Sequence, residues 1–365
     1  MIKNVKHYLI LCLTLIVLVS LVFTGCSSTA PDSKEEVKDN TEAAAGETKD
    51  SGEKTSYTIG FSNFSVGNSW RVQMEAEFKA EAEKFKSEGV IKDVIMTNSN
   101  GDISKQIADV KDLITKKVDA IIITASSPSA LSPVVEEAMS KGIKVVSFDN
   151  YVETDNITAK VGIDEVEFGR KGGQFLADAL SGKGNIIVLN GAAGTAVNEM
   201  RYNGAKEIFA KYPDIKILGE ANADWDYAKG KAAVENFLSA YPQIDAVWSQ
   251  GGAMTQAAID AFIAAGRPLV PMSGEANNGM LKLWKANVDK GFDSIAPSSP
   301  TYLSASALDV AIDALQGKTI EKNVVLDVPV VTKDNLDDYV KPDLPDSYWN
   351  ITKLSEEDVK TLFSK

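Results

Sequence analysis

The sequence predicts an α/β protein built from two similar, doubly wound parallel-sheet domains. From residue 57 onward, short β-branched runs alternate with longer helical patterns, and this alternation occurs twice. Runs such as Ile121-Ile122-Ile123 and Ile186–Leu189 are apolar on both faces, as strands buried inside a parallel sheet are. Strand–helix–strand repetition predicts right-handed crossovers. Residues 57–365 also exceed the length of ~250–300 residues at which a single core stops growing, which favours two domains.

The expected strands fall into two sets of four. The first set is Tyr57–Ser62, Asp93–Thr97, Ala120–Thr124 and Lys144–Phe148, and the second is Asn185–Asn190, Ile215–Gly219, Ala246–Ser249 and Leu269–Met272. Helices are expected between them. Ser132-Pro133 predicts a helix with Ser132 as its N-cap and Pro133 as its first residue, and Gly142 predicts its end.

The N-terminus has the pattern of an export signal. Lys3 and Lys6 precede an apolar run from Tyr8 to Phe23, which is shorter than a typical membrane span, so residues 1–25 are expected to be a signal peptide. Val22-Phe23-Thr24-Gly25-Cys26 resembles a bacterial lipobox, which implies acylation of Cys26; the alternative is an ordinary cleavage site. Residues 26–56 are too polar to bury a core, so we expect a disordered, lipid-anchored linker there.

Composition excludes several kinds of site. The only histidine is His7, and the two cysteines are Cys12 and Cys26, so the protein without its signal would keep no histidine and one cysteine. A Ser-His-Asp triad, a histidine-bearing zinc site and an intrachain disulfide are therefore excluded. The net charge of −13 becomes −15 when Lys3 and Lys6 are removed. We expect no nucleic-acid partner for so acidic a body.

Polar and aromatic side chains follow the predicted strands, where open parallel sheets bind their ligands. The loops are Asn63–Arg71, Asp149-Asn150, Gly191–Arg201, Asp224–Asp226, Gln250–Gly252 and Gly274–Asn278. Their Asn, Asp, Glu, Gln, Arg and Trp residues suit a sugar, because planar polar groups pair with hydroxyls and aromatic faces pack on C–H surfaces.

Five stretches in the same order carry a family resemblance: Asn68–Trp70, Val145–Asp149, Gly191–Thr195, Ala223–Asp226 and Ser249–Gly252. Residues 57 to about 330 resemble the ribose-binding-protein type of periplasmic solute receptors, with the type 1 periplasmic binding fold. The resemblance implies two domains joined by a three-crossover hinge near Gly162–Asp164, Ile295–Pro297 and Asp327–Pro329. The N-terminal domain would comprise residues 57–162 plus 298–326, and the C-terminal domain 163–295 plus 329–365. Residues 331–365 run past the family body, and we expect them to lie along the second domain.

The resemblance also implies ligand-binding roles. Asn68 would hydrogen-bond the sugar, Trp70 and Trp225 would stack on it from facing domains, and Asp149 would accept from its hydroxyls. Arg71, Asn150, Glu199 and Gly251 depart from the residues of ribose binders, which puts ribose itself in doubt. The candidate ligand-binding residues are Asn68, Trp70, Arg71, Asp149, Asn150, Glu199, Arg201, Trp225, Gln250 and Glu275.

Each candidate also has an ordinary structural explanation. The tryptophans could anchor loops, Asp149 could cap a turn, and Glu199 could pair with Arg201 or face solvent. A purely structural role in forming the turns is the alternative for Gln250, for the glycines beside it and for Glu275.

The implied function is that of the substrate-binding lipoprotein of an ABC importer. It would capture a monosaccharide or related polyol on the outer face of the bacterial membrane and deliver it to a permease, as a monomer held by a lipid anchor at Cys26. No cofactor is expected, because Gly317-Lys318-Thr319 lacks the earlier glycine of a phosphate loop and no G-x-G-x-x-G is present.

Two alternatives from other classes stay open. One is a sensory receptor for a sugar or signal that feeds a chemotaxis or kinase partner. The other is a glycosidase that uses a carboxylate pair such as Asp149 with Glu199 or Glu275. The effector domain of a sugar-responsive repressor is excluded, because an export signal and linker stand where its DNA-binding segment would be.

Overall fold

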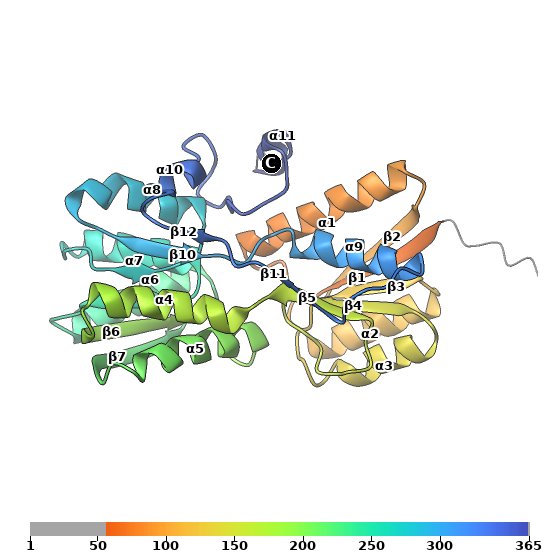
Figure 1. The fold of residues 1–365 in the computed structure, drawn as a ribbon, viewed down its shortest axis with the longest axis horizontal. Helices are drawn as coiled ribbons and strands as arrows, with labels where there is room; N and C mark the ends of the chain where they lie inside the picture. Colours follow the sequence, from red (N-terminus) through yellow and green to blue (C-terminus); the bar gives the residue numbers. More distant parts are fainter. Residues whose placement is uncertain (1–55, 364–365) are drawn as a thin grey trace, which may run out of the picture. The chain divides into compact units, whose positions relative to one another are not determined.

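The first lobe contains a six-stranded parallel sheet. The computed structural model describes residues 56–363, so the expected signal peptide, Cys26 and linker lie outside the described residues. In spatial order the strands are β11 (Asn323–Leu326), β5 (Ala159–Ile163), β4 (Lys144–Phe148), β3 (Ala120–Ile123), β1 (Tyr57–Asn63) and β2 (Ile91–Asn98) (Figure 1). The apolar run in β3 is fully buried and its neighbours pair with it in parallel, as the sequence predicts.

The second lobe repeats this strand order. Its strands are β12 (Val330–Val331), β10 (Ser294–Pro297), β9 (Met272–Ser273), β8 (Ala246–Ser249), β6 (Lys183–Asn190) and β7 (Asp214–Asn222). All pairs are parallel except the edge pair β10–β12. The predicted class of two similar doubly wound α/β domains is confirmed. The strand expected at Leu269–Met272 begins later than predicted, because only Met272 and Ser273 pair with neighbouring strands.

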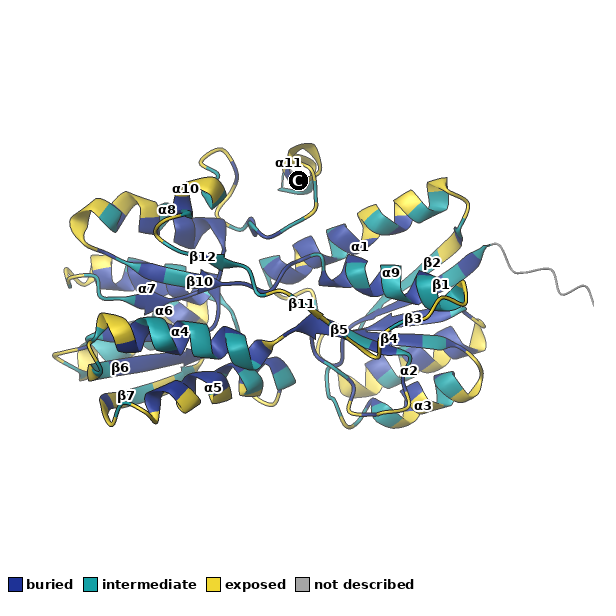
Figure 2. Ribbon diagram, in the orientation of Figure 1, coloured by how far each residue is buried: buried dark blue, intermediate teal, exposed yellow. Residues whose placement is uncertain are grey.

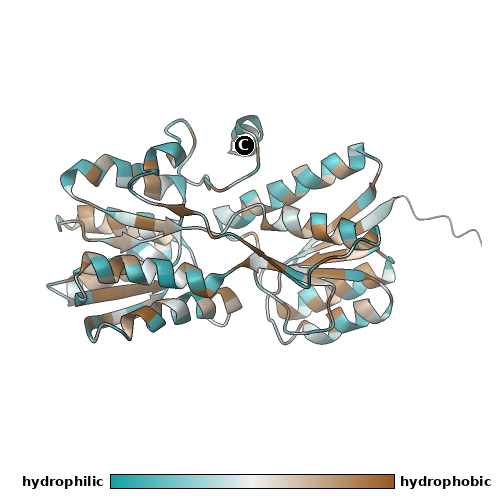
Figure 3. Ribbon diagram, viewed as in Figure 1, coloured by the Kyte–Doolittle hydropathy of each residue, from teal (hydrophilic) through white to brown (hydrophobic). Residues whose placement is uncertain are grey.

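Helices cover both faces of each sheet. In the first lobe, α1 (Ser69–Ser87) and α9 (Leu303–Leu315) pack on one face, and α2 (Ile103–Thr115) and α3 (Ser132–Ser140) pack on the other. In the second lobe, α4 (Glu165–Ala179) and α5 (Ala196–Phe209) face α6 (Tyr227–Ala240), α7 (Gly252–Ala264) and α8 (Asn278–Asn287) across the sheet. Figures 2 and 3 show the resulting layers, with buried apolar strands between helices whose outer faces are exposed and polar.

Alternate residues of β3 supply the two cores of the first lobe. Ala120 and Ile122 belong to the cluster under α1 and α9, whereas Ile121 and Ile123 belong to the cluster under α2 and α3. The two-residue period of a strand explains why this short run must be apolar throughout.

The helix start predicted at Ser132 is shifted by one residue. Ser132 is already helical, and its Oγ donates to the carbonyl oxygens of Pro128 and Glu153 instead of capping. Pro133 does stand in the first turn, and Gly142 takes a left-handed φ of 82° just after the helix. Boundary shifts of this size are common because terminal turns are irregular.

The chain passes between the lobes at the three expected places. It runs from β5 into α4 through Asp164, from β10 toward α9, and from β11 to β12. Asp164 fixes the first crossing by capping α4, because its Oδ1 accepts from the backbone N–H of Glu167 at 2.8 Å. Where the chain divides into mechanical domains stays a prediction.

The C-terminal segment contacts both lobes. After β12 it forms α10 (Leu336–Tyr339) beside α8, then an irregular stretch with turns, and then α11 (Glu356–Phe363). This irregular stretch hydrogen-bonds Asn278 of the second lobe and also Gln73 and Glu77 of the first. The segment expected to lie along the second lobe therefore reaches the first lobe as well. No helix of the described part of the chain is long and apolar enough to cross a membrane.

Two glycines allow α4 and α5 to approach at backbone distance. A Cβ added to Gly169 would lie 1.8 Å from the carbonyl oxygen of Arg201, and one added to Gly204 would lie 2.0 Å from that of Val166. A real Cβ cannot occupy such a position, so this close crossing requires glycine on both helices.

We expect Gly169→Ala to destabilise the protein by about 1–3 kcal/mol or more, because the backbone of α5 must move to admit the methyl group. Alanine is the better helix former by about 1 kcal/mol, so intrinsic propensity alone predicts the opposite sign. The free energy of unfolding, measured by urea titration, distinguishes the steric expectation from the one based on helix propensity. Lys171→Ala on the same helix is the control and should change it by less than about 0.5 kcal/mol. A more stable Gly169→Ala variant would show that the helices can separate freely.

Candidate functional site

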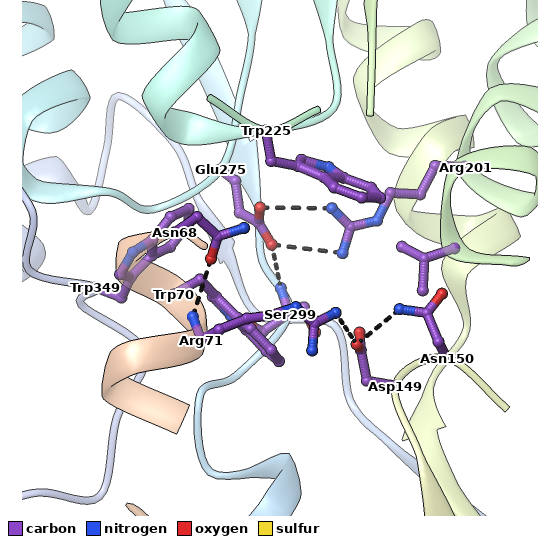
Figure 4. Close-up of a pocket in the computed structure, with 11 residues that line it drawn as sticks. Asn68, Trp70, Arg71, Asp149, Asn150, Arg201, Trp225, Glu275, Ser299 and Trp349 are labelled. Carbon is purple, nitrogen blue, oxygen red and sulfur yellow. Dashed lines mark hydrogen bonds and ion pairs between the residues drawn. The ribbon is translucent and has the colours of Figure 1, made fainter. Parts of the chain in front are cut away.

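A cavity that is partly open to solvent lies where the carboxyl ends of the two sheets face each other. Trp225 and Glu275 close it on one side in Figure 4, with Asp149 and Asn150 opposite. Its walls come from both lobes and from the C-terminal segment. The lining residues are Asn68, Trp70, Arg71, Asp149, Asn150, Val197, Arg201, Trp225, Glu275, Ser299 and Trp349.

In the first lobe an arginine and a carboxylate form a buried ion pair. Nη2 of Arg71 donates to Oδ2 of Asp149 at 2.7 Å, and both side chains are almost fully buried. Asn150 Nδ2 donates to the same oxygen at 3.0 Å, and the Arg71 guanidinium lies 4.1 Å from the ring centre of Phe64. Arg71 stands in the first turn of α1, where Oδ1 of Asn68 accepts from its backbone N–H at 3.0 Å.

The second lobe contains a matching arrangement with one more carboxylate. Nε of Arg201 donates to Glu165 at 2.6 Å, and its two terminal nitrogens lie 3.4 and 3.5 Å from the carboxylate oxygens of Glu275. Nη1 also donates to the carbonyl oxygen of Gln250 at 2.9 Å. The backbone N–H of Ser299 donates to Glu275 at 2.9 Å. One guanidinium therefore faces two buried carboxyl groups.

Burial changes the protonation of these carboxyls. It raises the pKa of Glu165 to about 7, although Arg201 opposes this shift. Burial also raises the pKa of Glu275, with Arg201 again opposing. Both shifts favour the protonated, uncharged form of these carboxyls, and the Arg201 guanidinium favours the charged form.

Trp225 lies against two glycines in the wall of the second lobe. A Cβ on Gly191 would lie 2.1 Å from the Trp225 indole, and one on Gly251 would lie 2.7 Å from it. Asp224 and Trp225 both have left-handed φ angles, 52° and 55°, and so does Asp149 at 57°. Such backbone costs about 1–3 kcal/mol per residue and clusters at functional sites.

Four polar atoms of the cavity wall are buried and have no hydrogen-bond partner within the described residues. They are Nη1 of Arg71, Oδ1 of Asn150, Nε1 of Trp225 and Oγ of Ser299. Two are donors, one is an acceptor, and the serine hydroxyl can be either. A buried polar group without a partner costs about 1–3 kcal/mol, and the four atoms together call for a partner that both donates and accepts hydrogen bonds.

Eight of the ten candidate residues line the cavity, and two do not. Glu199 is exposed, because it lies two residues along α5 from both Val197 and Arg201, which share the inner face. Gln250 is buried behind the wall, where its amide donates to Asn190 and Asn198. Whether the eight lining residues bind a ligand stays a prediction.

Sequence reasoning missed three lining residues: Val197, Ser299 and Trp349. Val197 could have been found from its spacing of four residues from Arg201 on one helix, and Ser299 from its place just after a strand. Nothing local marks Trp349. Within residues 56–363, no group of three or more His, Cys, Asp or Glu residues is placed to hold a metal ion.

The fold and this interlobe cavity define a two-lobed solute-binding protein. The model of the periplasmic binding protein domain matches residues 59–319, and the chain belongs to that family. Membership implies export from the cytoplasm. It also makes this chain a binding protein and not an enzyme, so the glycosidase alternative is excluded.

Individual relatives bind sugars and polyols. The xylitol-binding protein of Mycolicibacterium smegmatis is 32% identical over 277 residues, which cover 74% of this chain and 78% of that protein. An ABC transporter solute-binding protein from Bacillus halodurans, solved with bound myo-inositol, is 26% identical with a TM-score of 0.70, covering 80% of this chain and 99% of its own. The fructose-binding periplasmic domain of a hybrid two-component system is 31% identical with a TM-score of 0.67. The match covers 77% of this chain and 92% of that domain.

We expect the stability difference between wild type and Glu165→Gln to depend on pH. The pKa of Glu165 is about 7 in the folded protein and about 4.3 in an unfolded chain. The folded state therefore holds this proton more tightly, and the resulting stability is fully present below about pH 4.3 and is lost as pH rises through 7. Glutamine does not titrate.

The free energy of unfolding of wild type should thus fall relative to that of Glu165→Gln between pH 5 and pH 8. Urea titrations at pH 5, 6.5 and 8 measure this, with Asp178→Asn at an exposed site of the same helix as the matched control. If the free energy of unfolding of wild type instead rose with pH relative to that of Glu165→Gln, the ion pair with Arg201 would affect the pKa of Glu165 more than burial does.

Proposed function

We propose that this protein captures an uncharged monosaccharide or polyol in the interlobe cavity and delivers it to an ABC permease. The observation that carries the proposal is the set of four unpartnered polar atoms on Arg71, Asn150, Trp225 and Ser299. Sugar hydroxyls donate and accept at once, so one ligand can satisfy donors and acceptors in the same wall. The sugar- and polyol-binding relatives support the same class of ligand.

The charges of the cavity favour a neutral ligand. Arg71 is already paired with Asp149, and Arg201 faces Glu165 and Glu275. A phosphate or carboxylate on the ligand would find no free cation among these residues, and burying an unpaired charge is costly. Trp70 from the first lobe and Trp225 from the second present their rings to the cavity, which suits the C–H surface of a sugar.

A sensory role is the second candidate. It is favoured by the similarity to the fructose-binding domain of a hybrid two-component system. Ligand binding would be the same in both cases, and only the partner would differ. Uptake of labelled ligand into vesicles that contain the cognate permease separates the two: transport that depends on the protein supports the importer.

Asn150→Ala tests the ligand-binding role of the wall. We expect it to weaken binding at least tenfold, because the ligand loses a hydrogen bond to a buried acceptor worth about 1.4 kcal/mol or more. The same change also removes the hydrogen bond that Nδ2 donates to the buried carboxylate of Asp149, so we expect the free energy of unfolding to fall by about 1.5–3 kcal/mol as well.

Calorimetric titration with xylitol, D-ribose, D-fructose and myo-inositol measures the affinity. Ribose 5-phosphate tests the charge argument and should not bind. The matched control is Glu199→Gln, at the exposed residue of α5, which should bind as wild type does. A wild-type protein that binds none of the neutral probes would refute the proposed function.

We also propose that the mature protein is a lipoprotein, acylated at Cys26, with a monomeric body on the outer face of the membrane. The lipobox-like sequence around Cys26 supports this. Cys26→Ala should release the protein from the membrane fraction into the soluble one, and mass spectrometry of the wild-type N-terminal peptide should show an acylated cysteine. A Cys26→Ala protein that stays with the membrane would contradict the lipid anchor.

A further inference from the structure

Residues 341–353, a stretch of turns here called the C-terminal strap, lie beyond the residues that the family model matches. The strap is fastened first to α8 of the second lobe. Nδ2 of Asn278 donates to the carbonyl oxygen of Lys341 at 2.8 Å and to that of Leu344 at 3.0 Å, and Oδ1 accepts from the backbone N–H of Lys341 at 3.0 Å. The backbone N–H of Asn278 also donates to the carbonyl oxygen of Tyr348 at 2.8 Å.

The strap is then fastened to α1 of the first lobe. The side chain of Gln73 bonds both backbone groups of Trp349, accepting from its N–H at 3.0 Å and donating to its carbonyl oxygen at 2.8 Å. Glu77 accepts from the backbone N–H of Lys353 at 3.0 Å and from the hydroxyl of Thr352. The chain therefore crosses between the lobes a fourth time, and Trp349 stands at the crossing.

The indole of Trp349 is held in the cavity wall with its polar atom already engaged. Nε1 donates to Oγ of Ser69 at 2.9 Å, and the residue is only 6% exposed. Figure 4 shows it beside Asn68, at the end of the cavity away from Asp149 and Asn150. A ligand that reaches this end meets a ring and no hydrogen-bonding group of Trp349, which suits the C–H edge of a sugar or polyol.

We propose that Trp349 is a ligand-binding residue that determines specificity. It closes the end of the cavity beside Asn68 and packs against the carbon chain or ring edge of the ligand, so it limits how long the ligand can be. This inference rests on the proposed function. It adds a third aromatic wall, one that comes from the strap and not from either α/β lobe.

The competing explanation is that Trp349 only ties the lobes together. The two make different predictions across a set of ligands. Loosening the strap would change the balance of open and closed forms and shift the affinity for every ligand by the same factor. Removing a contact with the ligand would change the affinities by different factors, because ligands of different length touch the ring to different extents.

The experiment compares wild type, Trp349→Ala, Trp349→Phe, Ser69→Ala and Thr352→Val in the full chain. Dissociation constants for D-ribose, xylitol, D-fructose and myo-inositol are measured by calorimetry. Thr352→Val is the matched control, since it removes a strap contact with Glu77 outside the cavity. Ser69→Ala removes the partner of Nε1 and leaves the ring in place.

We expect Trp349→Ala to weaken the tightest probe about tenfold or more and to change the ratio of affinities between shorter and longer probes at least fivefold, in favour of the longer. Trp349→Phe should keep most of the affinity, and Thr352→Val should change all probes by one small common factor. Tryptophan fluorescence should show a smaller ligand-induced change in Trp349→Phe than in wild type.

If Trp349→Ala raised the dissociation constants of all probes by one common factor, and Thr352→Val raised them by the same factor, the inference would be overturned and the proposed function would stand. If only one probe binds wild type, equal losses of affinity for that probe in Trp349→Ala and Thr352→Val would overturn the inference. Wild type that binds no probe would refute the proposed function, and this inference with it.

Discussion

The two buried arginine–carboxylate pairs are the constraint to which the rest of the site conforms. Each pair joins an arginine on the helix after the first strand of its lobe to a carboxylate that follows the fourth strand: Arg71 to Asp149, and Arg201 to Glu275. Charges removed from water are tolerated only when their remaining hydrogen bonds are made. Backbone groups of Gln250 and Ser299 supply these in the second lobe, so the strand ends must bring those loops together.

Much of the fold follows from local sequence, because strands buried on both faces must be apolar at every position. Ile121–Ile123 could be assigned to a buried strand for that reason. The short strand β9 could not be placed to the residue, since only Met272 of the expected run Leu269–Met272 pairs with neighbouring strands. The antiparallel edge strand β12 carries no distinguishing pattern of its own; its direction is set by the third crossing between the lobes.

The site was predictable where chain position alone determines geometry. Residues directly after a strand, such as Asp149 and Glu275, reach the sheet edge whatever the side-chain details. On a helix the angle matters as well: Val197 and Arg201 share a face of α5, and Glu199 between them points outward. Trp349 is placed by the bonds of Gln73 to its own backbone and of Asn278 to the neighbouring Tyr348, and both partners are far away in the chain, so no local pattern could reveal it.

The ion pairs within each lobe have a consequence for how the two halves of the site influence each other. Each lobe pairs its own arginine with its own carboxylates, but the charges also act across the cavity. Burial raises the pKa of Glu165 and of Glu275, and the charge of Asp149 in the first lobe adds to both shifts. A substitution that removes the charge of Asp149 therefore also changes how tightly the carboxyls of the opposite lobe hold their protons, so the two halves of the site are separate in their hydrogen bonds and coupled in their charge.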